Sequence, residues 1–361
     1  MADLRFRTEE LQSRGVYQTY GTSFGYPFTQ VEQLNTPISP RENFQRFISG
    51  GEYYWVPNLS TDFNLLFSDT TPDCMAQEFA GGYDAFGCHW IPVKNAALPA
   101  FVKPGNPVLK DIAQWESFPW PDPDKWNWKA MREKHQPCMY PERANYGYLC
   151  GVFFERLIHL LDSEEALCAL VTEEEAVWNV FDRLAAYHCR TLEHWKQDMD
   201  VDAVWIGDDW GTQIGPFFSR DVLNRLIAPH YRRILDKCQE LEVFPITHSC
   251  GKTAAYMPDY IRMGIRAWQP QLSCNEDVFD LQKQYGGPML HTYELIGDMT
   301  GTMSVEELRA DTQEKARKYL CDGMVFVDYA AWDDQWREKN RVVYELLRKA
   351  ASGELETGGI I

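Results

Sequence analysis

The chain has 361 residues, 45% of them hydrophobic, so it is long enough to bury a large core. Its formal net charge of -18 argues against nucleic acid or an anionic membrane surface as a partner, because both would repel it. No apolar run is long enough to span a bilayer, and the ten cysteines include no CxxC pair. These features together predict a reduced, cytoplasmic protein.

The first part of the chain, residues 1–40, is predicted to be an extension that packs on the main body. It is polar and aromatic, and Pro37 and Pro40 rule out a long helix there. Residues 41–361 carry no linker-like stretch, so we assign them to one domain. Two early strands are expected, at residues 54–59 and 149–154.

The second half alternates regularly between strand and helix patterns. Predicted strands cover residues 203–207, 243–247, 266–269, 288–292 and 324–327, and predicted helices include residues 256–263 and 278–285. Ser219 and the Ser304/Glu307 capping box mark the starts of two further helices, and Thr172 with Glu175 the start of a long one. Successive strand–helix units predict an α/β fold with a parallel sheet. The pattern alone does not separate a closed eight-stranded barrel from an open sheet.

Polar side chains follow each of the five later strands. The carboxyl ends of parallel strands meet on one face, where sites are built, so we expect these side chains to share one pocket. In chain order they are Asp208, Asp209, Trp210 and Gln213; His248 and Cys250; Gln269, Cys274 and Asn275; Tyr293 and Glu294; and Asp328 and Tyr329.

The clearest candidates for a metal site are His248 and Cys250. One residue separates them, so at strand spacing both side chains point the same way, and imidazole and thiolate are good zinc ligands. A core cysteine beside a histidine bonded to a carbonyl is the alternative. Zinc needs a third protein ligand, for which Cys274 is the first candidate, followed by Glu294 and Asp328.

The adjacent acids Asp208 and Asp209 must be separated, protonated or paired with a cation. One of them fits a turn or a helix cap, which leaves the other for substrate or proton transfer. Tyr293 and Glu294 could orient a substrate or supply a proton, although a salt-bridged structural glutamate is an equal alternative. We assign substrate contacts to Trp210, Gln213, Gln269, Asn275 and Tyr329.

Three motifs in this sequence resemble the uroporphyrinogen decarboxylase superfamily. They are HSCG at residues 248–251, DDWGTQ at residues 208–213 and GYDAFG at residues 82–87. The chain looks most similar to the corrinoid-linked methyltransferases, including the methyltransferase component of anaerobic O-demethylases. This resemblance implies a single (β/α)8 TIM barrel with its site at the carboxyl ends of the strands.

The chain departs from the family in two places. It lacks the arginine-rich segment near the N-terminus with which uroporphyrinogen decarboxylases hold tetrapyrrole carboxylates. The coenzyme-thiol methyltransferases of the superfamily hold zinc with HxC and a later cysteine near the last strand. His248 and Cys250 match the first two ligands, but DYA at residues 328–330 offers no cysteine. The resemblance therefore does not supply the third ligand.

The resemblance implies transfer of a methyl group from a small methylated donor, such as a methoxyaromatic, to a corrinoid carried by a separate protein. Zinc would act as a Lewis acid, and Asp208, Asp209 or Tyr293 would protonate the leaving oxygen. A metal-free decarboxylase or lyase and a non-catalytic ligand-binding protein stay open as alternatives. The sequence does not determine the donor, the direction of transfer or whether the chain forms a homodimer.

Overall fold

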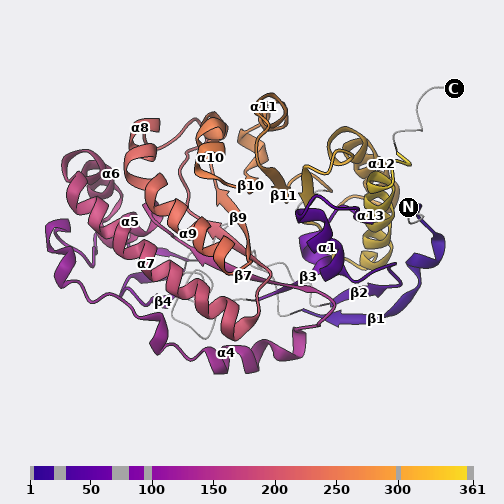
Figure 1. Ribbon diagram of the computed structural model, residues 1–361, viewed down its shortest axis with the longest axis horizontal. Coiled ribbons are helices and arrows are strands. Elements are labelled where there is room, and N and C mark those ends of the chain that lie inside the picture. Colours follow the sequence, from indigo (N-terminus) through magenta and orange to yellow (C-terminus); the bar gives the residue numbers. More distant parts are fainter. Residues whose placement is uncertain (1–3, 20–29, 67–80, 93–99, 298–301, 356–361) are drawn as a thin grey trace.

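The computed structural model describes residues 4–19, 30–66, 81–92, 100–297 and 302–355. Its centre is a curled parallel sheet of seven strands in the order β12-β11-β10-β9-β8-β7-β3, with helices along its outer face (Figure 1). The strands are β3 (Phe63–Leu65), β7 (Ala144–Cys150), β8 (Ala203–Gly207), β9 (Phe244–Ser249), β10 (Ala267–Pro270), β11 (Met289–Thr292) and β12 (Val325–Val327). The predicted α/β class with a parallel sheet is confirmed.

We predicted a closed barrel of eight strands, but the described strands form an open sheet of seven. The edge strands of this sheet are β3 and β12. A single parallel bridge between Asn58 and Val327 and a 3.0 Å hydrogen bond from the Val327 N–H to the Pro57 carbonyl link these edges. The short helix α2 (Leu59–Asp62) follows at once and stops this segment from pairing further. The fold is therefore TIM-barrel-like but not closed.

The five later strands lie within two residues of their predicted positions, whereas the two early strands do not. Residues 54–59 contain only the bridge at Asn58, and the strand that follows is β3. The strand predicted at residues 149–154 is β7, which starts earlier and ends before Gly151, whose φ is +59°. All seven residues of β7 are buried, so its asparagine, glycine and tyrosines show no alternation.

The helix signals were mostly correct. Ser219 caps α8, and the Ser304/Glu307 capping box begins α12. The predicted cap of the long helix was wrong: Thr172 ends α6, where its hydroxyl bonds to the Cys168 carbonyl at 3.1 Å. The helices are α1 (Pro40–Ile48), α4 (Trp128–His135), α5 (Phe154–Leu161), α6 (Ser163–Thr172), α7 (Glu174–Met199), α8 (Arg220–Val222), α9 (Ala228–Glu240), α10 (Met257–Met263), α11 (Val278–Tyr285), α12 (Val305–Lys315) and α13 (Trp336–Ala351). No helix of the described ranges is long and apolar enough to cross a membrane.

Helix α1 packs against the amino-terminal side of the sheet. The Phe44 ring lies edge-on at 4.6 Å from Phe63, the first residue of β3, and at 5.7 Å from Phe244, the first residue of β9. Phe47 contacts Phe326 of β12 at 6.0 Å. These buried aromatic rings stabilise the core at this side by apolar burial, which leaves the carboxyl ends of the strands for polar chemistry.

The GYDAFG motif forms part of a small sheet of β4 (Gly82–Tyr83), β5 (His89–Pro92) and β6 (Ala100–Val102). Asp84 is buried and accepts a 2.7 Å hydrogen bond from the Arg156 guanidinium of α5. Burial opposes ionisation, but Arg156 outweighs it and holds the pKa of Asp84 below its usual value. This motif therefore joins two parts of the fold through a buried ion pair.

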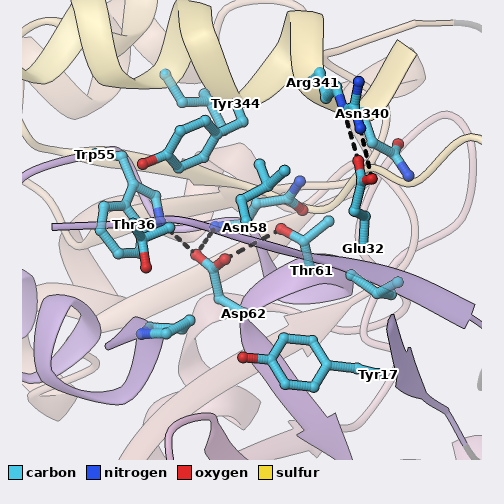
Figure 2. Close-up of a pocket in the computed structure, with 14 residues that line it drawn as sticks. Tyr17, Glu32, Thr36, Trp55, Asn58, Thr61, Asp62, Asn340, Arg341 and Tyr344 are labelled. Atoms are coloured by element: carbon cyan, nitrogen blue, oxygen red, sulfur yellow. Dashed lines mark hydrogen bonds and ion pairs between the residues drawn. The ribbon is translucent and has the colours of Figure 1, made fainter. Parts of the chain in front are cut away.

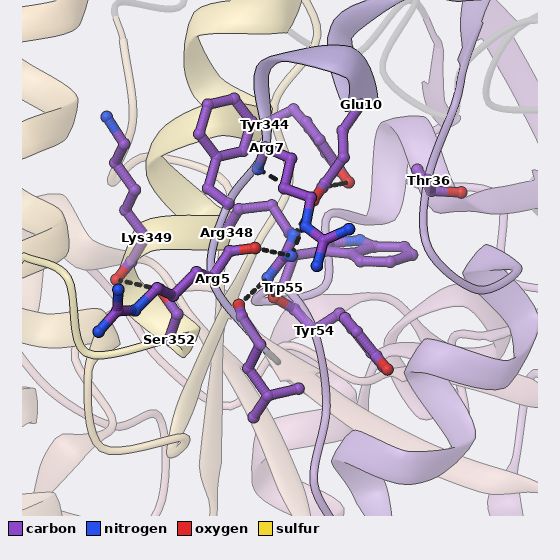
Figure 3. Close-up of polar contacts among 12 residues, drawn as sticks. Arg5, Arg7, Glu10, Thr36, Tyr54, Trp55, Tyr344, Arg348, Lys349 and Ser352 are labelled. Carbon is purple, nitrogen blue, oxygen red and sulfur yellow. Dashed lines mark hydrogen bonds and ion pairs between the residues drawn. The ribbon is translucent and has the colours of Figure 1, made fainter. Parts of the chain in front are cut away.

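The N-terminal segment is attached to α13 by Arg348 (Figure 3). The buried guanidinium donates hydrogen bonds to both carboxylate oxygens of Glu10, at 2.7 and 2.9 Å, and to the backbone carbonyls of Leu4, Arg5 and Tyr54. A single side chain thus connects three segments that are distant in sequence. The hairpin of β1 (Ser13–Gln18) and β2 (Gln30–Leu34) follows.

A small cavity lies between this hairpin, α13 and the segment before β3 (Figure 2). Glu32 on its wall is held by two hydrogen bonds from Arg341, and Asp62 accepts from the Asn58 N–H and the Trp55 indole. The volume of the cavity is about 40 Å³, which is enough for one or a few water molecules but not for a substrate.

We expect Arg348→Met to lower the free energy of unfolding by about 3–5 kcal/mol, because it leaves the Glu10 carboxylate buried without its partner. Urea denaturation followed by circular dichroism measures the change. The matched control is Arg46→Met, which breaks an exposed pair with Glu42 and should cost less than about 1 kcal/mol. Equal effects of the two substitutions would contradict the anchoring role of Arg348.

Candidate metal centre

Asp209, His248 and Cys250 bring three metal-ligating atoms together at the carboxyl ends of β8 and β9. All three atoms lie within 4.8 Å of one another. His248 Nε2 is 3.3 Å from Cys250 Sγ and 3.5 Å from Asp209 Oδ1. The pairing of Gly207 with His248 in adjacent strands sets this approach, because Asp209 follows two residues later. The structure thus brings together two of the predicted ligands and a residue predicted as an acid.

The neighbours of His248 decide which ring nitrogen faces the site. Its Nδ1 lies 3.1 Å from the backbone carbonyl oxygen of Gln269, which only accepts, so Nδ1 carries the proton. Burial lowers the pKa of His248, which favours the neutral ring. The lone pair of Nε2 is therefore directed at Cys250 and Asp209, as in histidines that bind metals through Nε2.

Asp209 and Cys250 hold each other in place. The backbone N–H of Cys250 donates to Asp209 Oδ1 at 2.6 Å. Burial, together with the charge of Asp209, raises the pKa of the Cys250 thiol far above its usual value. A carboxylate, a thiol and an imidazole lone pair thus face one point, where a divalent cation would favour the thiolate form of Cys250. Nitrogen, sulfur and carboxylate oxygen are a donor set that fits zinc.

The loops that follow β8 and β9, which carry Asp209 and Cys250, touch at two glycines. A Cβ on Gly251 would lie 2.1 Å from the carbonyl carbon of Gly211, and the φ of +79° at Gly251 also favours glycine. Next to this contact the Lys252 N–H donates to the Thr212 carbonyl at 2.7 Å. No other residue type would allow the loops to approach so closely.

Asp208 does not share the site with its neighbour. It is fully buried, and its two oxygens accept from three backbone N–H groups, of residues 153–155 at the start of α5, and from the Trp210 indole at 2.7 Å. Burial nevertheless raises its pKa to about 6. Asp208 is therefore the helix-capping member of the acidic pair, and Asp209 is the one that reaches the metal ligands.

The other predicted ligands lie outside the triad. Cys274 contacts the Gln271 carbonyl at 3.6 Å, although it is close enough to contribute to the raised pKa of Cys250. The Glu294 carboxylate accepts from backbone N–H groups of residues 272 and 273. Asp328 accepts from the Ser60 hydroxyl. Among the described residues, the third ligand-type atom beside His248 and Cys250 therefore belongs to Asp209, whereas the sequence had favoured Cys274 for this position.

Tyr293 lies close to the centre. Burial raises the pKa of its hydroxyl well above the usual value, and the charges of Glu294, Cys250 and Asp209 add to this. The hydroxyl therefore keeps its proton at neutral pH. The role of proton donor that the sequence suggested for Tyr293 stays a prediction.

The predicted substrate-binding residues have mixed positions. Trp210 is buried against Tyr231 and Tyr260, on the helix-covered side of the sheet. Asn275 holds the backbone of residues 251–254. Gln213 bonds to the Gln271 side chain at the surface, and the Gln269 carbonyl orients His248. The backbone of Tyr329 forms two hydrogen bonds with the Asn58 side chain. Trp210 and Asn275 thus serve the scaffold.

Sequence reasoning missed Trp205 and His291. The Trp205 ring stacks on His248 at 4.8 Å, and its indole N–H donates to Gln269 Oε1 at 2.7 Å. The sequence carried one signal for Trp205, which is the glycine at position 207. In the structure a Cβ at Gly207 would lie 2.1 Å from the Trp205 ring, so only glycine leaves room for it. A glycine two residues after a strand tryptophan allows that ring to fold along the strand.

No protein-family model matches this sequence, and no curated protein is similar to it in sequence. Among solved structures, a methyltransferase from Methanosarcina mazei superposes with a TM-score of 0.59 at 13% identity, over 89% of this chain and 100% of that one. A B12-independent methionine synthase from Shewanella sp. W3-18-1 is more distant, with a TM-score of 0.43 at 13% identity and 80% of each chain covered. The first likeness shows that the chain shares the methyltransferase's fold.

We expect zinc to bind at about one ion per chain and to release the Cys250 proton, because the thiolate is the ligand. Cys250→Ala should abolish zinc retention, and Asp209→Asn should weaken it about 10- to 100-fold. Elemental analysis and zinc titration of the purified protein measure both effects. Cys274→Ala is the matched control and should retain zinc. Loss of zinc in that variant alone would return Cys274 to the ligand set.

Gly251→Ala should separate the two ligand loops, because the added methyl group has no room beside Gly211. We expect a loss of stability of about 1–3 kcal/mol or more together with weaker zinc binding. Thermal unfolding with and without zinc measures both. Gly215→Ala is the control, since a Cβ there meets nothing within 4 Å. A Gly251 variant as stable and as zinc-competent as the control would show that the close contact is not needed.

Proposed function

We propose that this protein is a zinc-assisted methyltransferase that transfers a methyl group from a small methylated donor to a corrinoid held by a separate protein. The observation that carries the proposal is the approach of Asp209, His248 and Cys250 at the carboxyl ends of parallel strands. The fold shared with the Methanosarcina mazei methyltransferase and the motif resemblance to corrinoid-linked methyltransferases support it.

Asp209, His248 and Cys250 are the residues that would hold zinc. When bound, the ion would supply Lewis-acid polarisation of the donor oxygen. The protein's own part is preorganisation: Gln269 fixes the His248 tautomer, and the Cys250 N–H fixes Asp209. The groups are therefore in position before the donor arrives.

The leaving oxygen must gain a proton when its methyl group departs. We assign this proton to the hydroxyl of Tyr293, whose pKa is raised by burial and by the charges of Glu294, Cys250 and Asp209. Zinc held by Cys250 and Asp209 would offset their charges and make this hydroxyl a better proton donor. Asp208 is unsuited to this step, because its oxygens already accept from the backbone N–H groups that begin α5 and from the Trp210 indole. Proton transfer from Tyr293 leaves a phenolate that regains its proton from water.

The acidic chain favours a corrinoid protein with a basic contact surface, since opposite charge speeds association. We propose that this partner docks at the carboxyl-end face, where the three ligands lie. Steering of this kind weakens as ionic strength rises.

The test mixes zinc-loaded protein with a panel of methoxyaromatics and free cob(I)alamin in place of the corrinoid protein. Formation of methylcobalamin is followed spectroscopically under anaerobic conditions. We expect methyl transfer by the wild type, a fall of about 10- to 100-fold or more in Cys250→Ala and Asp209→Asn, and a rate near wild type in Cys274→Ala. Tyr293→Phe should lower kcat with little effect on zinc.

The proposal fails if zinc-loaded wild type methylates no cob(I)alamin from any donor. It also fails if Cys250→Ala keeps full activity. In either case a metal-free decarboxylase or lyase with Asp209 as its working group becomes the better assignment.

A further inference from the structure

Three buried polar atoms on the strands of the parallel sheet have no hydrogen-bond partner among the described residues. One is Nε1 of Trp268 on β10, whose ring lies against Tyr260 of α10 on the helix side. The other two are Nε2 of His291 on β11 and the hydroxyl of Tyr146 on β7. Both side chains are 0% exposed. Buried polar groups are nearly always paired, so these two atoms call for an acceptor or donor that the described protein atoms do not provide.

The proton on His291 is assigned by its neighbours. The indole N–H of Trp205 can only donate, so the Gln269 atom that faces it at 2.7 Å is the amide oxygen. The Gln269 amide nitrogen therefore faces His291 Nδ1 at 2.9 Å and donates to it. Since burial lowers the pKa of His291 to about 3, the ring is neutral, and its single proton sits on Nε2. The unpartnered atom is thus a fixed N–H donor.

Both residues lie on the inner face of the curled sheet. Thr247 bonds to Tyr231 of α9 at 3.0 Å and so faces outward, which turns His248 inward. His248 is in register with Gln269, whose side chain reaches His291. The inner face is therefore continuous from the candidate metal centre to His291.

A chain of aromatic rings joins Tyr146 to the same centre. The ring of Tyr146 contacts Tyr148 at 5.2 Å, Tyr148 contacts Trp205 at 6.0 Å, and Trp205 stacks on His248. On the other side, His291 stacks on Phe326 at 4.6 Å with the rings 9° from parallel. The surface around the two unpartnered atoms is thus largely aromatic.

We infer that His291 Nε2–H donates to an oxygen atom of a small aromatic ligand bound on the inner face of the sheet, next to the His248 centre, and that the Tyr146 hydroxyl is a second polar contact for the same ligand. The oxygen is that of a neutral hydroxyl or carbonyl group. An anionic oxygen would face Asp328, whose charge already acts on Tyr146, in a protein of net charge -18. Under the proposed function, on which the identity of the ligand rests, this oxygen belongs to the non-reacting end of the methyl donor.

The probes are guaiacol and 2-methylanisole, which have nearly the same shape and differ by a hydroxyl in place of a methyl group. Binding to zinc-loaded protein is measured by calorimetry and by quenching of tryptophan fluorescence. We expect the wild type to bind guaiacol at least tenfold more tightly than 2-methylanisole. His291→Phe should remove this preference while keeping the stack on Phe326, and Tyr146→Phe should reduce it.

The matched control is His230→Phe on α9. Both ring nitrogens of His230 are also buried without a partner in the described ranges, but they pack among Trp178 and Phe181 on the helix side. This control should keep the full guaiacol preference. In the wild type, the His291 Nε2–H resonance should be observed by nitrogen-15 NMR and should shift on adding guaiacol, a readout that does not depend on a variant folding.

The inference is overturned if the wild type binds the two probes within twofold of each other or binds neither. It is equally overturned if His291→Phe keeps the preference, and a buried water would then be the partner of the His291 N–H. Zinc content and methyl transfer are measured on the same samples. Failure of methyl transfer with an intact preference removes the proposed function alone, whereas methyl transfer without a preference removes the recognition site alone.

Discussion

Gln269 makes three hydrogen bonds on which the candidate site depends. Its backbone carbonyl fixes the proton of His248 on Nδ1, while its amide group accepts from Trp205 and donates to His291. One residue thereby holds two buried histidines in opposite tautomers, one offering a lone pair and the other an N–H. Gln269 can do this only because four parallel strands, β8 to β11, keep these side chains in register.

Other buried polar groups of the fold also have specific partners. Asp84 and Glu10 are each paired with a buried arginine, and Asp208 is satisfied by backbone N–H groups and an indole. The triad differs, because Asp209, His248 and Cys250 offer three ligand-type atoms within 4.8 Å of one another. Paired buried charges hold a structure together, whereas a close group of titratable side chains with shifted pKa values is typical of functional sites.

Some elements could be predicted because one physical signal dominates them. Strands β8 to β12 are short apolar runs bounded by polar residues, and Ser304 with Glu307 satisfies helix N–H groups by purely local bonds. Strand β7 could not be placed correctly, since Asn145 and its tyrosines are buried by tertiary contacts that composition does not show. The lack of closure depends on α2, a turn of four residues with no distinctive pattern.

The sequence by itself determined the α/β class, the clustering of polar residues after the later strands, and the pairing of His248 with Cys250, because these follow from local spacing. Tertiary structure alone decided which acid completes the set. Asp208 and Asp209 are adjacent and chemically identical. Asp208 accepts from backbone N–H groups at the start of α5, whereas Asp209 accepts from the Cys250 N–H. The roles of Gln269 and His291 also arise only when separate strands come together, since each depends on a hydrogen bond between residues about twenty positions apart.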